Sequence, residues 1–345
     1  MALKLETHDS VDHLRSTLHH GDCLSVLDSL PPESFQMIYA DPPFFSDRSY
    51  LSGTRTAFVD KWGGGIGEYL AWMEPRLAAC QRVLATNGSI YLHCDYHASH
   101  YLKILMDRIF GYENSVNEII WKRQSAHSDN GQGAKHFGRI HDTIFFYSRS
   151  REYVWNNQYL PYGNEYVKRR YRHVEPETQR RYALGDLTGP GGASKGNPYF
   201  EFLGVSRYWR YSKHRMEELL KENRIYVTKP GNVPLLKRYL DEMKGVPIQD
   251  IWLDHWNRDP GSISYPTEKP QGLLSQIIRA SSNPGSLVLD PFCGSGSTLV
   301  AAHRLGRNWC GIDISGLAIE ISRRRLLEIG AEVRTQHVKQ CFPIQ

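Results

Sequence analysis

The chain has 345 residues, 40% of them hydrophobic and 23% charged, and a formal net charge of +5 at pH 7. This composition is typical of a soluble globular protein and excludes an intrinsically disordered chain. No apolar run reaches the roughly 18 residues of a membrane helix, and the first residues lack the apolar core of a signal peptide.

Six cysteines are scattered along the chain without a Cys-x-x-Cys pair: Cys23, Cys80, Cys94, Cys293, Cys310 and Cys341. This spacing favours free thiols in a reducing cytoplasm and disfavours a structural zinc site. His93, Cys94, Asp95 and His97 form a cluster of possible metal ligands. Alternation along a strand leaves only some of them on one face, so we expect no metal.

The first predicted elements are short. Residues before about position 20 resemble a leader that carries little information. A helix is expected over residues 24–30 and a strand over 35–40. Residues 46–67 are expected to form a mobile loop, with the glycines near position 64 acting as a hinge for a lid. No Gly-Lys-Ser/Thr follows them, so this is not a phosphate-binding loop.

Helices and strands then alternate. Helices are predicted over residues 69–84, 100–110, 298–305 and 317–329, and strands over 89–93, 140–147, 286–290 and 308–313. This alternation predicts an α/β fold with a doubly wound, mostly parallel sheet. In such sheets ligands bind at the carboxyl ends of the strands.

Asp41-Pro42-Pro43-Phe44 directly follows the first of these buried strands. Asp41 offers a carboxylate and Pro42 a carbonyl on a restricted backbone, while Phe44 offers a flat apolar face. Two acceptors and a ring suit a planar group that bears an NH₂. The alternative is an ordinary strand followed by a proline turn.

A glycine-rich turn lies near the other end of the chain. The sequence Pro291-Phe292-Cys293-Gly294-Ser295-Gly296-Ser297 follows a strand, precedes a helix and has Asp313 about 20 positions further on. This layout can hold a nucleoside ribose. Leu299 stands where a dinucleotide fingerprint needs its third glycine, so S-adenosylmethionine suits the turn better than a pyrophosphate. An ordinary turn between strand and helix is the alternative.

Positive charge is concentrated in the middle of the chain. Residues 121–239 hold 22 Lys and Arg against 11 Asp and Glu, and 20 of the 40 aromatic residues. Since the whole chain is +5, the remainder carries a net charge of −6. Basic residues interleaved with aromatic ones suit contact with DNA phosphates and bases. The candidates for this contact are Arg169, Arg170, Arg172, Arg180, Arg181, Lys195, Arg207 and Arg210.

The order of these motifs resembles a known family. Asp-Pro-Pro-Phe at 41–44, Thr-Glu-Lys-Pro at 267–270 and Asp-Pro-Phe-Cys-Gly-Ser-Gly-Ser-Thr at 290–298 resemble the bacterial site-specific DNA amino-methyltransferases. Their order is similar to the permuted beta class, in which the catalytic motif precedes the target-recognition region and the cofactor motif. The resemblance covers nearly the whole chain, from about position 20 to about 327.

The resemblance implies site residues. The catalytic motif would be Asp41, Pro42, Pro43 and Phe44, where the family more often has tyrosine in place of the phenylalanine. The cofactor residues would be Asp22, Lys269, Asp290, Phe292, Gly294, Ser295, Gly296, Thr298 and Asp313. Among these, Lys269 would pair with the cofactor carboxylate, Asp290 would lie near its amino group and Asp313 would accept hydrogen bonds from the ribose. The alternative roles are helix capping for Asp22 and Asp313, and a surface position for Lys269.

The resemblance also implies a domain plan and a function. Residues 20–120 would be the catalytic half of a Rossmann-like methyltransferase domain and residues 251–330 the cofactor-binding half. The inserted region, 121–250, would recognise DNA, with its first part to about 150 completing the sheet. The expected activity is methyl transfer from S-adenosylmethionine to a flipped base of double-stranded DNA, at adenine N6, with cytosine N4 as the alternative. A homodimer is also consistent with the family.

The sequence is also compatible with other functions. An RNA or protein-glutamine methyltransferase, a catalytically silent DNA-binding protein and a Rossmann oxidoreductase are the less favoured interpretations. A cytosine carbon-5 methyltransferase is disfavoured, because the chain has no Pro-Cys pair to supply the nucleophile.

Overall fold

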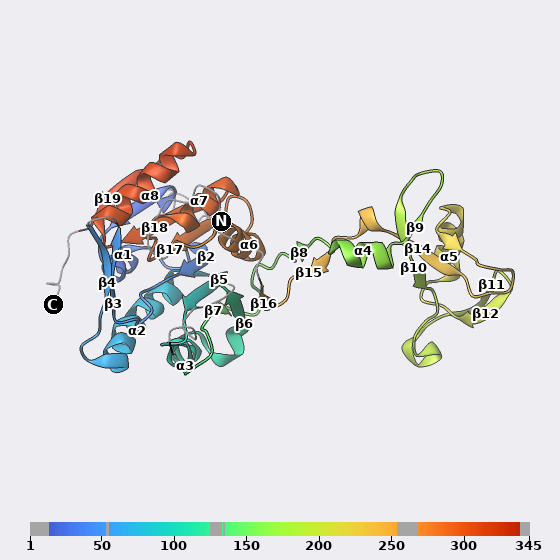
Figure 1. Ribbon diagram of the computed structural model, residues 1–345, viewed down its shortest axis with the longest axis horizontal. Helices are drawn as coiled ribbons and strands as arrows, with labels where there is room; N and C mark the ends of the chain where they lie inside the picture. Colours follow the sequence, from blue (N-terminus) through green and yellow to red (C-terminus); the bar gives the residue numbers. More distant parts are fainter. Residues whose placement is uncertain (1–13, 53–54, 125–132, 134, 254–267, 339–345) are drawn as a thin grey trace, which may run out of the picture. The chain divides into compact units, whose positions relative to one another are not determined.

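The computed structural model describes residues 14–52, 55–124, 133, 135–253 and 268–338 (Figure 1). The chain divides into two compact units, of which one comprises residues 1–158 and 249–345 and the other residues 159–248. Thr267, the first residue of the Thr-Glu-Lys-Pro motif, lies outside the described residues, as do most of the expected leader and Cys341.

The first unit is built on a nine-stranded sheet. In spatial order its strands are β16 (Ile251–Trp252), β6 (Ser115–Lys122), β7 (His141–Ser148), β5 (Leu84–Cys94), β2 (Phe35–Ala40), β17 (Leu287–Asp290), β18 (Asn308–Asp313), β1 (Thr17–His20) and β19 (Arg334–His337). All neighbours pair in parallel except β7, which is antiparallel to β5 and β6. The predicted mostly parallel, doubly wound sheet is therefore confirmed.

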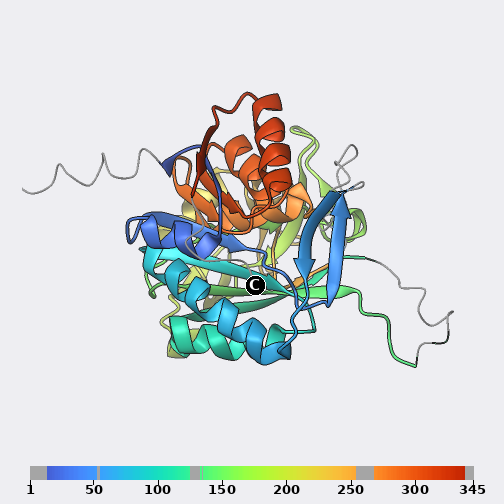
Figure 2. The same ribbon diagram turned by 90° about the vertical axis from the view of Figure 1, so that its left-hand side faces the viewer.

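Helices cover both faces of this sheet. One layer contains α1 (Cys23–Ser29), α2 (Gly65–Val83) and α3 (Ser99–Phe110), and the other contains α6 (Gln271–Ser281), α7 (Ser297–Arg304) and α8 (Gly316–Glu328). Figure 2 shows the sheet between the two layers. Strands buried on both faces have continuous apolar runs, which is why Leu287–Asp290 and Phe35–Ala40 were recognisable from sequence.

Two expectations about the first unit are wrong. Residues 46–67 are not a single loop, because they contain a hairpin of β3 (Arg48–Ser52) and β4 (Arg55–Asp60), and Gly65 already belongs to α2. The glycine cluster lies at the start of that helix, and its role as a hinge for a lid stays a prediction. The segment before position 20 is not an empty leader either, because β1 pairs with both β18 and β19. A four-residue strand is too short to show a period in the sequence.

The second unit has its own small core. Its main sheet has the order β13 (Ile225–Tyr226), β14 (Leu235–Tyr239), β10 (Arg181–Asp186) and β9 (His173–Val174). A hairpin of β11 (Tyr199–Phe202) and β12 (Val205–Tyr208) and helix α5 (Lys213–Lys221) bury Trp209, Met216 and Leu219 with it. Helix α4 (Asn164–Arg170) and the paired strands β8 (Tyr159–Leu160) and β15 (Val246–Pro247) complete this unit.

Candidate active site

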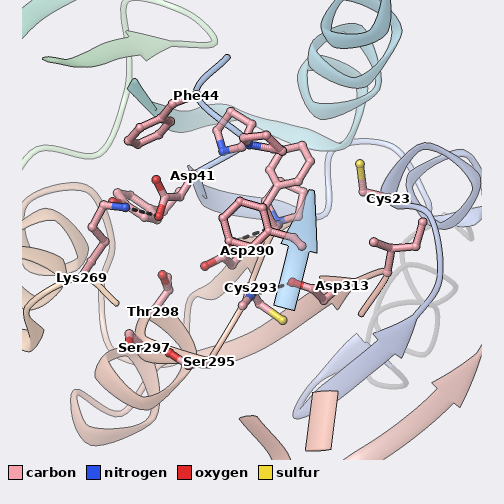
Figure 3. Close-up of a pocket in the computed structure, with 18 of the residues that line it drawn as sticks. Cys23, Asp41, Phe44, Lys269, Asp290, Cys293, Ser295, Ser297, Thr298 and Asp313 are labelled. Carbon is pink, nitrogen blue, oxygen red and sulfur yellow. Dashed lines mark hydrogen bonds and ion pairs between the residues drawn. The ribbon is translucent and has the colours of Figure 1, made fainter. Parts of the chain in front are cut away.

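Four carboxylates lie at the carboxyl ends of four adjacent parallel strands. In the spatial order β2, β17, β18, β1, the strands lead to Asp41, Asp290, Asp313 and Asp22. All four line one pocket, which therefore holds both the Asp-Pro-Pro-Phe motif and the glycine-rich turn. Figure 3 labels Asp41, Asp290 and Asp313 among the residues that line this pocket. The sheet brings together residues from distant parts of the sequence, because β2 and β17 are neighbours with Leu289 opposite Ile38.

The Asp-Pro-Pro-Phe turn is held by a buried carboxylate that sequence reasoning missed. Asp60, at the end of β4, accepts hydrogen bonds from the backbone amides of Phe44 (3.1 Å), Phe45 (3.1 Å) and Ser46 (2.7 Å). It also accepts from the Ser46 hydroxyl and the Trp62 indole. Phe45 has a φ of 61°, a strained value for a residue other than glycine, which this set of bonds stabilises.

Two further contacts define the turn. The Tyr69 hydroxyl donates to the Pro43 carbonyl at 2.8 Å, while Pro42 is buried against the pocket. Asp41 accepts a hydrogen bond from Lys269 Nζ at 2.5 Å through Oδ2. Its other oxygen, Oδ1, is buried and has no hydrogen-bond partner among the described residues. A buried acceptor without a donor is unfavourable, so this atom is ready for a donor supplied by a ligand.

Phe44 is supported from behind by a buried polar chain. The His93 ring stacks on Phe44 with centroids 5.5 Å apart, and it hydrogen-bonds Tyr39 at 2.6 Å and Asp142 at 3.2 Å. Burial acts to raise the pKa of Asp142. The hydrogen bond from His93 and the charge of Arg123 outweigh burial and hold this pKa below its ordinary value. The ionised carboxylate can only accept, so His93 donates from Nε2.

The glycine-rich turn has the conformation that its sequence indicates. Gly294 and Gly296 have φ values of 50° and 77°, in the region that favours glycine. A Cβ at position 296 would lie 2.7 Å from Ser322 Oγ, so a larger residue does not fit. Asp313 accepts hydrogen bonds from the amides of Gly294 and Ser315, both at 2.8 Å, and so orients the turn.

Asp290 is the most buried of the four carboxylates, with 2% of its surface exposed. Burial raises its pKa to about 7, while hydrogen bonds from the Thr298 side chain and the Phe292 amide act in the opposite direction. Asp313 is similar, since burial raises its pKa although backbone amides stabilise the charged form. Such perturbed carboxyls in a pocket are typical of functional sites.

Asp22 has the structural contacts that were its alternative interpretation. It caps α1 by accepting from the amides of Leu24 and Ser25, and it pairs with Arg76 at 2.5 Å. It nevertheless lines the pocket, as do the Trp72 and Phe292 rings, whose centroids lie 5.9 Å apart. A carboxylate oxygen can accept more than one hydrogen bond, so capping leaves acceptor capacity toward the pocket.

Sequence reasoning also missed the anchor of the glycine-rich turn. Arg325, from α8, donates to Glu268 Oε1 at 2.6 Å and to the Ser295 carbonyl at 2.7 Å. Glu268 also accepts from the Ser297 hydroxyl at 3.2 Å. This network fixes the turn against the segment that carries Lys269. No sequence signal identifies Arg325, which is one of three consecutive arginines on a helix.

Two buried thiols in the pocket are unsuited to nucleophilic catalysis. Burial raises the pKa of Cys23 to about 12 and that of Cys293 well above its ordinary value. Because the thiolate is the nucleophile, these residues remain unreactive thiols. Within the described ranges, no group of three or more His, Cys, Asp or Glu side chains is arranged to bind a metal. The helices in these ranges include none with the length and apolarity needed to span a membrane.

The basic candidates for DNA contact all lie in the second unit and differ in their surroundings. Arg180 is engaged by Asp241 and Glu242 and lies over the Tyr239 ring. The other candidates are exposed, and the described residues include no carboxylate in an ion pair with them: Arg169, Arg170, Arg172, Arg181, Lys195, Arg207 and Arg210. Two exposed aromatic residues, Tyr199 and Tyr208, pack on each other, and Tyr208 directly follows Arg207 in the sequence. Tyr208 also packs against Gly192, which begins the short helical turn that ends at Lys195.

Comparison with known proteins agrees with this geometry. Residues 35–324 match the family model of the N6/N4 DNA methylases. The chain belongs to this DNA methylase family. A type II methyltransferase, M.EcaI of Enterobacter cloacae, is 32% identical over 84% of this chain, and the match spans 64% of its own length. The DNA adenine methyltransferase YhdJ of Escherichia coli is 27% identical over 90% of this chain and 82% of its own length.

The fold is also shared with solved structures. A putative DNA modification methylase from Thermus thermophilus, complexed with S-adenosyl-L-methionine, is 16% identical over 94% of this chain and 99% of its own, with a TM-score of 0.50. The chain, an N6/N4 DNA methylase, therefore shares its fold with that solved structure, and the pocket described above lies within that fold.

The pocket residues fit the cofactor of this family. S-adenosylmethionine carries an ammonium and a sulfonium charge, and Asp290 and Asp313, which line the pocket, are complementary to them when ionised. Asp313, at the entry to α8, has acceptor capacity for ribose hydroxyls. Gly294, in the glycine-rich turn, lines the pocket with backbone atoms alone.

Proposed function

We propose that this protein transfers a methyl group from S-adenosylmethionine to the exocyclic amine of a DNA base, at adenine N6. The observation that carries the proposal is the buried Oδ1 of Asp41, which lacks a donor among the described residues and shares a pocket with the glycine-rich turn. An incoming amine supplies the missing donor. The names of the two curated relatives, a type II methyltransferase and a DNA adenine methyltransferase, support the proposal.

The pocket residues act by position and electrostatics. The amine of a nucleobase is a weak nucleophile because its lone pair is delocalised into the ring. Asp41 Oδ1 and the Pro42 carbonyl accept the two amine hydrogens and direct the lone pair toward the methyl donor. Asp41 takes the proton during or after the transfer. When bound, the cofactor supplies the electrophilic methyl group.

Phe44 provides the surface on which the base rests. A base inside a duplex cannot reach the pocket, so it must leave the stack at a cost of about a few kcal/mol. Stacking on the Phe44 ring offsets part of that cost. The ring is held by His93, so it is available in a fixed orientation before the base arrives.

We further propose that residues 159–248 recognise the double-stranded DNA. This unit holds 17 Lys and Arg against 10 Asp and Glu, and its exposed arginines lie beside exposed tyrosines. Cationic side chains contact phosphates and planar ones contact bases. With double-stranded DNA as the substrate, we propose that the protein is located in the cytoplasm in association with DNA. The homodimer suggested by the family resemblance is tested by sedimentation equilibrium.

A methyl-transfer assay tests the function. Duplex DNA is incubated with the protein and tritiated S-adenosylmethionine, and label is counted in the DNA. We expect labelling by the wild type and at least about 100-fold less by Asp41→Ala. Asp107→Ala, which removes a carboxylate on α3 away from the pocket, is the matched control and should label normally. Label in RNA or protein alone would overturn the proposal.

Sequencing of genomic DNA from expressing cells, with detection of modified bases, identifies the target base. Adenine N6 methylation at one recurring site is the expected result. Cytosine N4 methylation would correct the base while leaving the class of reaction unchanged, because both amines present the same chemistry to Asp41.

A further inference from the structure

Lys269 reaches the catalytic carboxylate. Its Nζ lies 2.5 Å from Asp41 Oδ2, and both side chains are largely buried, with 9% and 16% of their surface exposed. The same Nζ lies 5.0 Å from the centroid of the Phe44 ring. Figure 3 shows the lysine side chain extending to Asp41 from the edge of the pocket. The family resemblance instead suggests the cofactor carboxylate as its partner.

The lysine comes from the cofactor half of the site. Glu268 is tied to the glycine-rich turn through Ser297 and Arg325, and Pro270 is the N-cap of α6. The residue before Lys269 is therefore tied to the glycine-rich turn, and the residue after it caps α6, whose Gln271 donates to the Ser297 carbonyl at 2.9 Å. The Lys269 side chain crosses from this anchor to the end of β2. One residue thus links the two halves of the pocket.

This link has a consequence for Asp41. A carboxylate can rotate and present either oxygen, but the ion pair holds Oδ2 on Lys269. Oδ1 is then the Asp41 oxygen that has no donor among the described residues. The amine of a base therefore meets this oxygen of Asp41 in one fixed orientation. The hydrogen bond from Lys269 to Asp41 joins two charged groups, and such bonds are short and strong.

We propose that Lys269 is a positioning residue for Asp41, which it orients so that Oδ1 accepts the amine of the target base. The inference rests on the proposed methyl transfer, since it assigns the lysine a role in that reaction. The role that the family resemblance implies is different. A lysine paired with the cofactor carboxylate would turn away from Asp41 in the working enzyme.

Two variants and two ligands separate these roles. Lys269→Met removes the charge at similar length, and Lys269→Arg keeps it. Binding of S-adenosylhomocysteine, which has the amino-acid carboxylate, is compared by calorimetry with binding of methylthioadenosine, which lacks it. Steady-state methylation of duplex DNA gives kcat and KM. Lys103→Met, which removes an ion pair with Asp107 on α3, is the control for the loss of a lysine.

We expect Lys269→Met to lower kcat by about 100-fold, as a misplaced catalytic group does, with less than about a threefold change in KM for DNA. Lys269→Arg should recover at least about a tenth of wild-type kcat. The affinity ratio of the two ligands should match that of the wild type in both variants. Lys103→Met should leave kcat unchanged.

Two results would overturn the inference. One is a tenfold or larger loss of S-adenosylhomocysteine affinity in Lys269→Met while methylthioadenosine binds as before, because that places the lysine on the cofactor carboxylate. The other is an unchanged kcat in Lys269→Met. A wild-type protein that binds both ligands but methylates no DNA would instead count against the proposed function, while the ligand ratio would still report the position of Lys269.

Discussion

The imidazole of His93 stacks on the ring of Phe44, with the planes inclined by 28°. His93 is fully buried and is held by Tyr39 on one side and Asp142 on the other. The three residues come from β2, β5 and β7, so three strands determine the orientation of the ring on which the base is proposed to rest. The Trp121 ring of β6 meets His93 edge-on. Phe44 therefore has a rigid support although it lies in a turn.

Replacement of His93 tests this support. His93→Ala opens a cavity behind Phe44 and leaves buried polar groups on Tyr39 and Asp142 without a partner. We expect a loss of about 3 kcal/mol in unfolding free energy and a higher KM for DNA, measured by urea unfolding and methylation kinetics. His97→Ala removes a partly exposed histidine from the same region. Equal losses in the two variants would show that His93 has no special role.

Asp60 is expected to control the shape of the catalytic turn. Asp60→Asn keeps the size of the side chain but exchanges one acceptor oxygen for a donor that faces backbone amides. Because hydrogen bonds to a charged group contribute about 1.5–3 kcal/mol each, the turn at residues 44–46 should relax and kcat should fall by about 100-fold. Binding of the cofactor, for which the glycine-rich turn is proposed, should change by less than about threefold.

The matched control for this variant is Asp186→Asn, because that exposed carboxylate also accepts from a backbone amide but lies in the second unit. It should leave kcat as in the wild type. Retention of wild-type kcat by Asp60→Asn would mean that the turn holds its shape without this carboxylate.

The raised pKa of Asp290 predicts that the stability of the folded protein depends on pH. Burial raises its folded-state pKa to about 7, from an ordinary value of 3.8. Between these two values the folded state keeps a proton that the unfolded state has lost, so this group lowers stability as pH rises from about 4 to about 7. Asp290→Asn removes the effect. At about pH 8 the variant should be more stable than the wild type by about 2–4 kcal/mol, as judged by unfolding at several pH values.

Asp290 should favour binding of the cofactor, although it lowers the stability of the free protein. A cationic ligand stabilises the ionised carboxylate, so its affinity for the wild type should rise as pH increases to about 7 and then level off. In Asp290→Asn the affinity should be lower and independent of pH over this range. Calorimetric titration on either side of this pKa provides the comparison, and parallel pH profiles for the two proteins would contradict this role of Asp290.

Gly296 and Gly330 form a matched pair for testing the glycine-rich turn. Their φ values are 77° and 79°, but a Cβ at position 296 meets Ser322 at 2.7 Å whereas one at position 330 meets nothing within 4 Å. Gly330→Ala should cost only the conformational strain of about 1 kcal/mol. Gly296→Ala should cost at least about twice as much and should abolish cofactor binding, measured by thermal unfolding and calorimetry. Similar behaviour of both variants would exclude a steric role for Gly296.

The neighbouring residues Arg180 and Arg181 separate structural from DNA-contacting cations. Arg180 is held by Asp241 and Glu242, whereas Arg181 is exposed. Arg181→Ala should weaken DNA binding and reduce the slope of log affinity against log salt by about 1, because one phosphate contact is lost. Arg180→Ala should leave that slope unchanged. A change of slope in Arg180→Ala but not in Arg181→Ala would reverse the assignment.

Elements with local signals could be predicted from the amino-acid sequence. The strand before Asp41, the strand before Asp290 and the glycine-rich turn are each recognisable within a few residues, through buried apolar runs and a Gly-x-Gly pattern. Each motif directly follows a strand, and parallel strands place their carboxyl ends at one edge of the sheet. A shared site could therefore be expected from the order of the elements alone.

The groups that support those motifs became apparent from the folded chain. Asp60 bonds to a turn 14 to 16 positions away, Lys269 to an aspartate 228 positions away, and His93 to Asp142 across two strands. None of these contacts has a period or a spacing that a sequence reveals. The pairing of β5 with β7 brings His93 to Asp142, and the hairpin of β3 and β4 returns Asp60 to the turn. Strand pairing depends on packing of the whole chain rather than on any segment of it.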